Sequence, residues 1–267
     1  IASCLVGSEM CIRDRYKAAR SYILYREERT QERKKEAPVI DIPNRLEINI
    51  TKTDGTLEPL DIDKVAALIN DACEGLEEVS MNEVLEEALK NLYDGVSIVD
   101  MRTSLVMSAR TKVEKEPNYS FVTARILMDQ IRSEALGFLG VASESSYQDM
   151  EKYYPLALNA YIDKGIELDI LNPELKTYDL KRLGEALDHT RDNQFTYLGL
   201  QTLYDRYFIH SNDTRYELPQ VFFMRVAMGL AIEEDDREGR AIEFYKLLSS
   251  FDLSLIHISE PTRQEAI

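Results

Sequence analysis

The chain has 267 residues, of which 44% are hydrophobic and 30% are charged, and its formal net charge is −16. This length allows one large domain or two ordinary ones, each with a real core. The acidic balance argues against nucleic-acid binding, which needs concentrated Lys and Arg. No apolar stretch approaches the roughly 20 residues that cross a bilayer. We expect a cytoplasmic, mainly α protein without membrane or nucleic-acid partners.

The two ends break the pattern of everything between them. Residues 1–15 read IASCLVGSEMCIRDR, and residues 253–267 read LSLIHISEPTRQEAI. Both resemble translated sequencing-adapter read-through, and the alternative is a pair of ordinary disordered tails. Artefactual ends are excluded from fold reasoning. We therefore interpret residues 16–252 and expect them to be an internal fragment of a longer protein.

The first predicted elements are a helix, a linker and a β-hairpin. Residues 16–35 predict a helix with an apolar patch, and Pro38 and Pro43 mark a linker over residues 36–45. From Leu46 the hydrophobic period changes to two, and Asp54-Gly55 follows as a strong turn signal. Residues 57–60 can return as a second strand. This is the one convincing hairpin in the sequence.

Four helices are expected to complete a compact unit over residues 46–140, small but viable as a domain. Asp94-Gly95 ends the second predicted helix, and Pro117 ends the third. The fourth helix runs to about residue 136. The residues predicted to begin these helices are of the kinds that cap helix N-termini. They are Asp61 or Asp63, Ser80 (with Glu83), Ser97 (with Asp100) and Asn118.

Beyond the junction at residues 140–146 the chain reads as helical throughout, with no second hairpin. Pro219 suits the first turn of a helix, where its missing N–H costs nothing. The predicted helices cover residues 147–164, 179–187, 196–208, 219–232 and 237–250. The fold class is therefore mainly α, with one small hairpin.

Residues 46–140 resemble the ATP-cone, a nucleotide-sensing module of ribonucleotide reductases and of a related transcriptional repressor. The family motif Val-x-Lys-Arg-Asp-Gly corresponds to residues 50–55, which read ITKTDG. Further matches are Glu58, Asp63-Lys64, residues 92–95 (LYDG) and residues 117–121 (PNYSF). Residues 18–26 look like the last helix of another cone. The resemblance therefore implies that residues 16–35 end a truncated upstream cone.

The resemblance implies a binding site for ATP or dATP as allosteric effector. Lys52 would pair with phosphates, and Glu58, Asp61 and Lys64 fall near positions that contact base, ribose or phosphate. Without the resemblance, Lys52 reads as an exposed strand lysine, and the other three read as residues that cap a helix start. The candidate set is Ile50, Lys52, Glu58, Asp61 and Lys64.

Thr53 stands where the family carries Arg, and Thr cannot replace a forked, always-charged phosphate contact. This departure favours a structural copy of the cone, with sensing by the upstream cone. Isolated residues 44–140 should then bind ATP or dATP weakly, and micromolar affinity would contradict this expectation.

A second resemblance covers residues 141–252. Residues 191–207 (RDNQFTYLGLQTLYDRY), residues 217–220 (ELPQ) and residues 224–227 (MRVA) are similar to the N-terminal helical domain of the class I bacterial reductase large subunit. This resemblance implies a parent oxidoreductase that makes deoxyribonucleotides from ribonucleoside diphosphates for DNA synthesis. It also implies a radical-bearing small subunit as partner and a homo-oligomer of large subunits.

We expect no catalytic residue and no metal site in this chain. Reductases of this family use at least three cysteines, whereas only Cys73 lies between the two unusual ends. The fragment should therefore be inactive alone. One alternative is a cone-bearing transcriptional regulator, which predicts a zinc ribbon and a basic surface that the sequence lacks. The other is a helical adaptor that uses its acidic surface.

Overall fold

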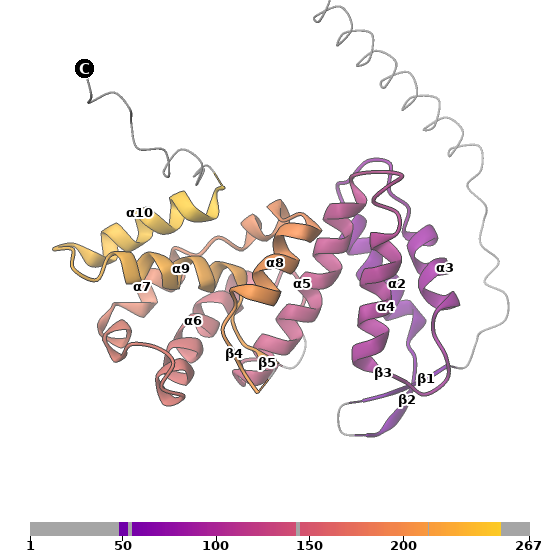
Figure 1. Cartoon of the computed structure of the whole chain (residues 1–267), viewed down its shortest axis with the longest axis horizontal. Helices are drawn as coiled ribbons and strands as arrows, with labels where there is room; N and C mark the ends of the chain where they lie inside the picture. The colour runs from indigo at the N-terminus through magenta and orange to yellow at the C-terminus, as the bar shows by residue number, and fades with distance from the viewer. Residues whose placement is uncertain (1–47, 53–54, 143–144, 213, 252–267) are drawn as a thin grey trace, which may run out of the picture. The chain divides into compact units, whose positions relative to one another are not determined.

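A computed structural model describes residues 48–52, 55–142, 145–212 and 214–251 (Figure 1). Several predictions concern residues outside these ranges. They are the two ends, the helix at residues 16–35, the linker at residues 36–45, and Thr53 and Asp54 at the hairpin turn.

The predicted hairpin is present, and a third strand extends it. Strand β1 (Asn49–Thr51) pairs antiparallel with β2 (Leu57–Pro59), with Ile50 opposite Glu58. Strand β3 (Val96–Ser97) pairs parallel with β1, so that the sheet order is β2-β1-β3. The sequence prediction missed β3 because two residues are too short to show a period of two.

Four helices follow the hairpin, as predicted. They are α2 (Ile62–Cys73), α3 (Met81–Lys90), α4 (Ile98–Arg110) and α5 (Tyr119–Phe138). The side chains of Asp61, Ser80 and Ser97 each accept a hydrogen bond from a first-turn backbone N–H, which confirms these three caps. Asn118 makes no such bond, and α4 ends at Arg110, several residues before Pro117.

Asp94 and Gly95 do not end a helix, because α3 stops at Lys90. Instead the Asp94 carboxylate accepts hydrogen bonds from the backbone N–H and the side-chain amide of Asn49, at 2.8 and 2.9 Å. The Gly95 N–H donates to the Asn49 carbonyl at 2.8 Å, and its φ of +82° suits glycine. These bonds fix the loop before β3 onto β1.

The rest of the chain is helical apart from one short hairpin. Its elements are α6 (Met150–Glu167), the 3-10 helix η1 (Pro173–Thr177), α7 (Leu180–Glu185), the 3-10 helix η2 (His189–Gln194), α8 (Tyr197–Arg206), α9 (Pro219–Leu230) and α10 (Arg237–Ser249). Pro219 opens α9 as predicted.

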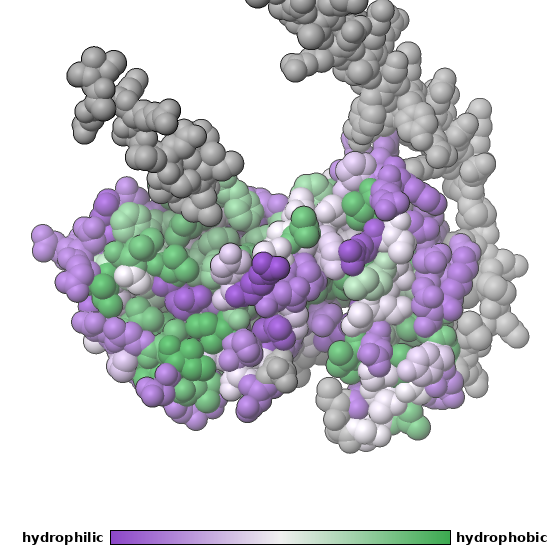
Figure 2. Space-filling model, viewed as in Figure 1, coloured by the Kyte–Doolittle hydropathy of each residue, from purple (hydrophilic) through white to green (hydrophobic). Residues whose placement is uncertain are grey.

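Apolar side chains are exposed on the helical region, among them Leu230 of α9 and Leu247 of α10. Figure 2 shows apolar surface over these two helices.

The prediction of no second hairpin was wrong. Strands β4 (His210–Ser211) and β5 (Thr214–Arg215) pair antiparallel, with Ser211 opposite Thr214. Two-residue strands carry no hydrophobic alternation, so the pattern alone could not reveal them. The turn chemistry could have done so, since Asn212 has a φ of +49°, which Asn tolerates better than most residues.

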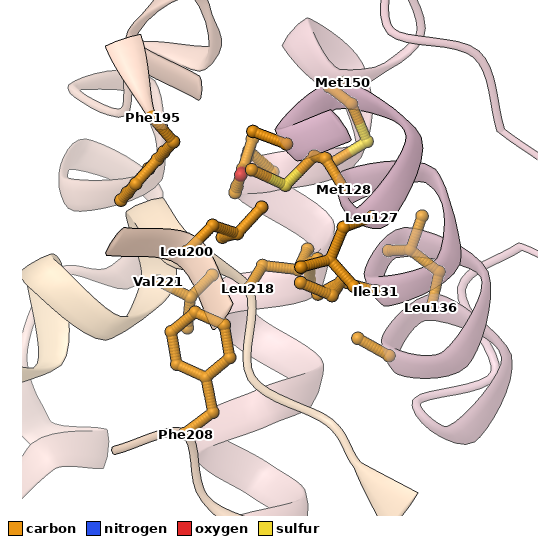
Figure 3. Packing of buried hydrophobic residues seen from close by; sticks show 14 of the residues in the cluster. Leu127, Met128, Ile131, Leu136, Met150, Phe195, Leu200, Phe208, Leu218 and Val221 are labelled. Carbon is orange, nitrogen blue, oxygen red and sulfur yellow. The ribbon is translucent and has the colours of Figure 1, made fainter. Parts of the chain in front are cut away.

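Helix α5 belongs to two packing layers at once. It contacts α2 and α4 on the hairpin side and α8, η2 and β5 on the other. Figure 3 shows Leu127, Met128 and Ile131 from α5 packed close to Leu200, Leu218 and Val221. One hydrophobic cluster therefore runs across the predicted boundary at residue 140. Cutting the chain there would expose the second face of α5 to water.

Candidate functional site

A cavity of about 870 Å³ lies beside the hairpin. Its lining comes from β1, β2, helix α2 along its whole length, helices α4 and α5, the segment 145–149 and Asn193. The structure brings together in this lining all five residues of the predicted site: Ile50, Lys52, Glu58, Asp61 and Lys64. Their role as ligand contacts remains a prediction.

The hairpin contributes an ion pair to the cavity. The Lys52 ammonium lies 2.7 Å from the Glu58 carboxylate, and the two side chains are 42% and 52% exposed. The lysine is therefore only partly exposed, and it is also paired. Because water reaches both groups, the pair contributes little stability, and an incoming anion can compete with Glu58 for Lys52.

At the start of α2, Asp61 fits the capping interpretation and Glu58 does not. The Asp61 carboxylate accepts from the Lys64 backbone N–H at 3.1 Å, so Asp61 caps the helix. Glu58 lies in β2 and does not cap the helix, which makes the capping interpretation of this residue wrong. Lys64 lies in the first turn of α2 and is exposed.

The inner wall of the cavity carries arginines that the sequence interpretation missed. Arg102 comes from α4, and Arg125 and Arg132 come from α5. The Arg125 guanidinium donates to the carbonyls of Ala72 and Glu74 at 3.0 and 2.7 Å, which satisfies carbonyls at the end of α2. Burial lowers the pKa of Arg125, and Coulombic interactions with Tyr147, Cys73 and Glu74 oppose that shift.

Arg132 is buried, with only 6% of its surface exposed. Its Nε has no hydrogen-bond partner, and its guanidinium carbon lies 5.5 Å from the centre of the Tyr147 ring. An arginine on a helix usually indicates a solvent-exposed position. The signal that could have identified it is its place between Ile131 and Ala135 on an otherwise apolar helix face.

The far wall lies outside the predicted 46–140 unit. Segment 145–149 lines the cavity together with Asn193 of η2. The Asn193 amide donates to the Tyr147 hydroxyl at 2.7 Å. Burial raises the pKa of Tyr147, and the charge of Asp192 raises it further. The cavity is therefore completed by residues of the helical region.

Behind Asn193 lies a buried polar network. The Asp192 carboxylate, 3% exposed, accepts from the Tyr154 hydroxyl and from the Gln220 amide, both at 2.8 Å. The Tyr245 hydroxyl donates to the Gln220 carbonyl oxygen at 2.9 Å. Burial raises the pKa of Asp192, while the charge of Arg132 opposes that rise. This network connects η2 to α6, α9 and α10.

Across the described ranges, no group of three or more His, Cys, Asp and Glu side chains could hold a metal ion. Within the same residues, no helix is long and apolar enough to cross a membrane.

Comparison with known families identifies both parts of this structure. Residues 48–134 match the family described as ATP cone domain, and residues 193–255 match the family described as ribonucleotide reductase, all-alpha domain. The first match contains the hairpin, α2, α3, α4 and most of α5, and with them the five predicted site residues. The chain thus joins a region that matches the ATP cone domain to a region that matches the all-alpha domain of ribonucleotide reductase.

Individual relatives agree with this assignment. The chain is 37% identical over 252 residues to the ribonucleoside-diphosphate reductase subunit alpha of Chlamydia muridarum, which covers 92% of this chain and 24% of the relative. It is 35% identical over 207 residues to the subunit alpha of Helicobacter pylori, covering 77% and 25%. It is 27% identical over 230 residues to the ribonucleoside-diphosphate reductase 1 subunit alpha of Escherichia coli, covering 80% and 28%.

The chain is therefore similar to ribonucleotide reductase large subunits and carries two domains that match their families. It spans about a quarter of the length of these relatives.

Proposed function

We propose that the cavity is an allosteric nucleotide site, which takes ATP or dATP as effector of a ribonucleoside-diphosphate reductase. The observation that carries this proposal is the convergence of all five predicted residues on one cavity, within the part of the chain that matches the ATP cone. The match of residues 193–255 to the reductase all-alpha domain favours a reductase over the cone-bearing regulator.

The lining offers groups suited to each part of a nucleotide. Triphosphate oxygens accept hydrogen bonds and carry negative charge, so cationic donors suit them, and Lys52 and Lys64 supply two such donors to the cavity. Ile50, Val65 and Leu68 offer apolar surface for a base. Glu58 and Asp61 can accept hydrogen bonds from ribose hydroxyls or from an exocyclic amino group.

Thr53 lowers the affinity that we expect. If the hairpin of other cones holds phosphate with Arg, losing that charge-assisted contact costs about 1–3 kcal/mol, or roughly 5- to 150-fold in affinity. We therefore propose that this chain binds ATP or dATP with an affinity weaker than micromolar.

Because α5 is packed on both sides and the cavity includes residues 145–149 and Asn193, nucleotide binding should be measured on the whole chain.

In the whole protein we propose that nucleotide binding biases the association of large subunits and their docking with a radical-bearing small subunit. Such control requires different affinities of the nucleotide for the alternative assemblies. The described residues would supply regulation and not chemistry. Cys73, the only cysteine among them, is half-buried, and burial raises its pKa to about 11, so that it stays a neutral thiol at pH 7.

Calorimetric titration of ATP and dATP into the full chain tests the proposal. Lys52→Gln should weaken binding by about tenfold, as expected for one lost phosphate contact. Lys90→Gln is the control, because Lys90 makes a similar surface ion pair, 3.0 Å from Glu86, and does not line the cavity. Equal binding by both variants, or no binding of either nucleotide to the unmodified chain, would contradict the proposal.

A further inference from the structure

Arg132 is a buried cation whose Nε has no hydrogen-bond partner among the described residues. Guanidinium groups carry five N–H donors, and burying a charge is costly unless a partner compensates it. In the described part of the chain no carboxylate forms an ion pair with Arg132, and its Nε lacks any acceptor. The buried carboxylate of Asp192 acts on Arg132 through its charge, but both of its oxygens already accept hydrogen bonds from Tyr154 and Gln220.

The cavity gives Arg132 access to a ligand. Arg132 lines the same space as Lys52 and Lys64, although it comes from α5 and they come from the hairpin and α2. A guanidinium binds phosphate through two parallel N–H donors, which a lysine cannot do. Because residue 53 is Thr and not Arg, it gives the hairpin no guanidinium group. Among the described residues, the guanidinium groups that line the cavity come from its inner wall.

We propose that Arg132 is a phosphate-binding residue of the cavity, held in position by Tyr147. This inference rests on the proposed nucleotide site and deepens it, because it assigns the phosphate contact to the inner wall. The bound nucleotide then touches the cone and the helical region together.

Tyr147 holds the guanidinium through its ring and is itself anchored. Stacking on an aromatic face stabilises the guanidinium plane and leaves its N–H edges available for an anion. The Tyr147 hydroxyl accepts from the Asn193 amide at 2.7 Å, which fixes the ring against η2. Tyr147 is thus a positioning residue that acts through Arg132.

A competing explanation is purely structural: Arg132 would serve only as a counter-charge for Asp192. The two explanations differ in which ligands an Arg132 variant should affect. A phosphate contact matters for ATP and for inorganic tripolyphosphate but not for adenosine. A structural counter-charge would affect all three probes alike, or none of them.

The test is calorimetry on the full chain with ATP, tripolyphosphate and adenosine as probes. Arg132→Gln should weaken the binding of ATP and of tripolyphosphate by about tenfold or more and leave the binding of adenosine unchanged. The affinities of Arg132→Lys for ATP and tripolyphosphate should lie between those of Arg132→Gln and the unmodified chain. Tyr147→Leu, which removes the ring, should weaken ATP more than Tyr147→Phe does. Arg110→Gln is the matched control, because Arg110 lies 5.4 Å over the Tyr197 ring and does not line the cavity.

The inference is overturned if folded Arg132→Gln binds ATP as tightly as the unmodified chain does. It is also overturned if this variant loses as much affinity for adenosine as for ATP. If this variant does not fold, phenylglyoxal modification of the unmodified chain decides the matter. ATP should protect Arg132 from the reagent, and unchanged modification would overturn the inference. If Lys52→Gln weakens ATP while Arg132→Gln does not, this inference alone fails. If the unmodified chain binds neither ATP nor tripolyphosphate, the proposed function fails with it.

Discussion

The Glu134 carboxylate at the end of α5 accepts a hydrogen bond from the Tyr204 hydroxyl of α8 at 2.7 Å. Its second oxygen accepts from the Arg215 backbone N–H of β5 at 2.6 Å. The Arg215 guanidinium in turn lies 4.5 Å over the Tyr204 ring. One side chain on the helix that lines the cavity therefore holds two elements of the helical region.

Replacing Glu134 by Ala should destabilise the protein by about 1–3 kcal/mol, because it leaves the part-buried Tyr204 hydroxyl and the Arg215 backbone N–H without an acceptor. Urea unfolding followed by circular dichroism measures the change. Glu86→Ala is the control, since Glu86 makes only an exposed ion pair with Lys90 and should cost less than about 1 kcal/mol. Equal losses in the two variants would show that Glu134 does not connect the elements.

The pH dependence of stability should reveal the buried carboxylate of Asp192. Burial raises its folded-state pKa above the ordinary value of 3.8. Its contribution to stability is therefore fully present below that value and is lost as the pH rises through the folded pKa. The melting temperature of the unmodified chain, relative to that of Asp192→Asn, should fall over this interval. A constant difference from acid to neutral pH would contradict the assignment.

The ion pair between Glu217 and Arg225 should be the one whose disruption destabilises the helical region most. Glu217 is fully buried and accepts from the Arg225 Nε at 2.6 Å, from the Tyr161 hydroxyl at 2.6 Å and from the Ile209 N–H at 3.0 Å. Arg225→Met leaves this carboxylate uncompensated and should cost about 3 kcal/mol in urea unfolding, the lower end for buried pairs, because Arg225 is 22% exposed.

The double variant Arg225→Met, Glu217→Gln separates charge from packing. Removing the buried charge together with its partner should restore much of the lost stability. If the double variant is no more stable than Arg225→Met alone, the loss comes from packing.

Two glycines should respond in opposite directions to alanine. A Cβ at Gly184 would lie 3.0 Å from Cα and Cβ of Pro155, where α7 meets α6, so Gly184→Ala should destabilise by about 1–3 kcal/mol. A Cβ at Gly137 in α5 meets nothing within 4 Å, so Gly137→Ala should stabilise by about 0.5–1 kcal/mol. Thermal unfolding distinguishes the two, and a stabilising Gly184→Ala would contradict the close approach of the helices.

Local chemistry explains why much of the fold could be predicted from the sequence. The caps at Asp61, Ser80 and Ser97 and the start of α9 at Pro219 depend on side chains next to the bonds they make. The five site residues lie within one short segment, which a motif can identify.

What could not be predicted depends on distant parts of the chain. Arg132 and Asn193 reach the cavity from elements that follow the hairpin by many residues, and no spacing rule relates them to Lys52. Strands β3, β4 and β5 are two residues each, so their pairing is a consequence of packing and not of pattern.

The central claim is that ATP occupies the cavity bounded by the hairpin, α5 and the segment 145–149. Hydrogen exchange with mass spectrometry on the full chain, with and without saturating ATP, tests it most directly. We predict added protection in peptides covering residues 48–65 and 145–149, with no change in α10. Protection confined to other segments, or none at saturating ATP, would contradict the claim.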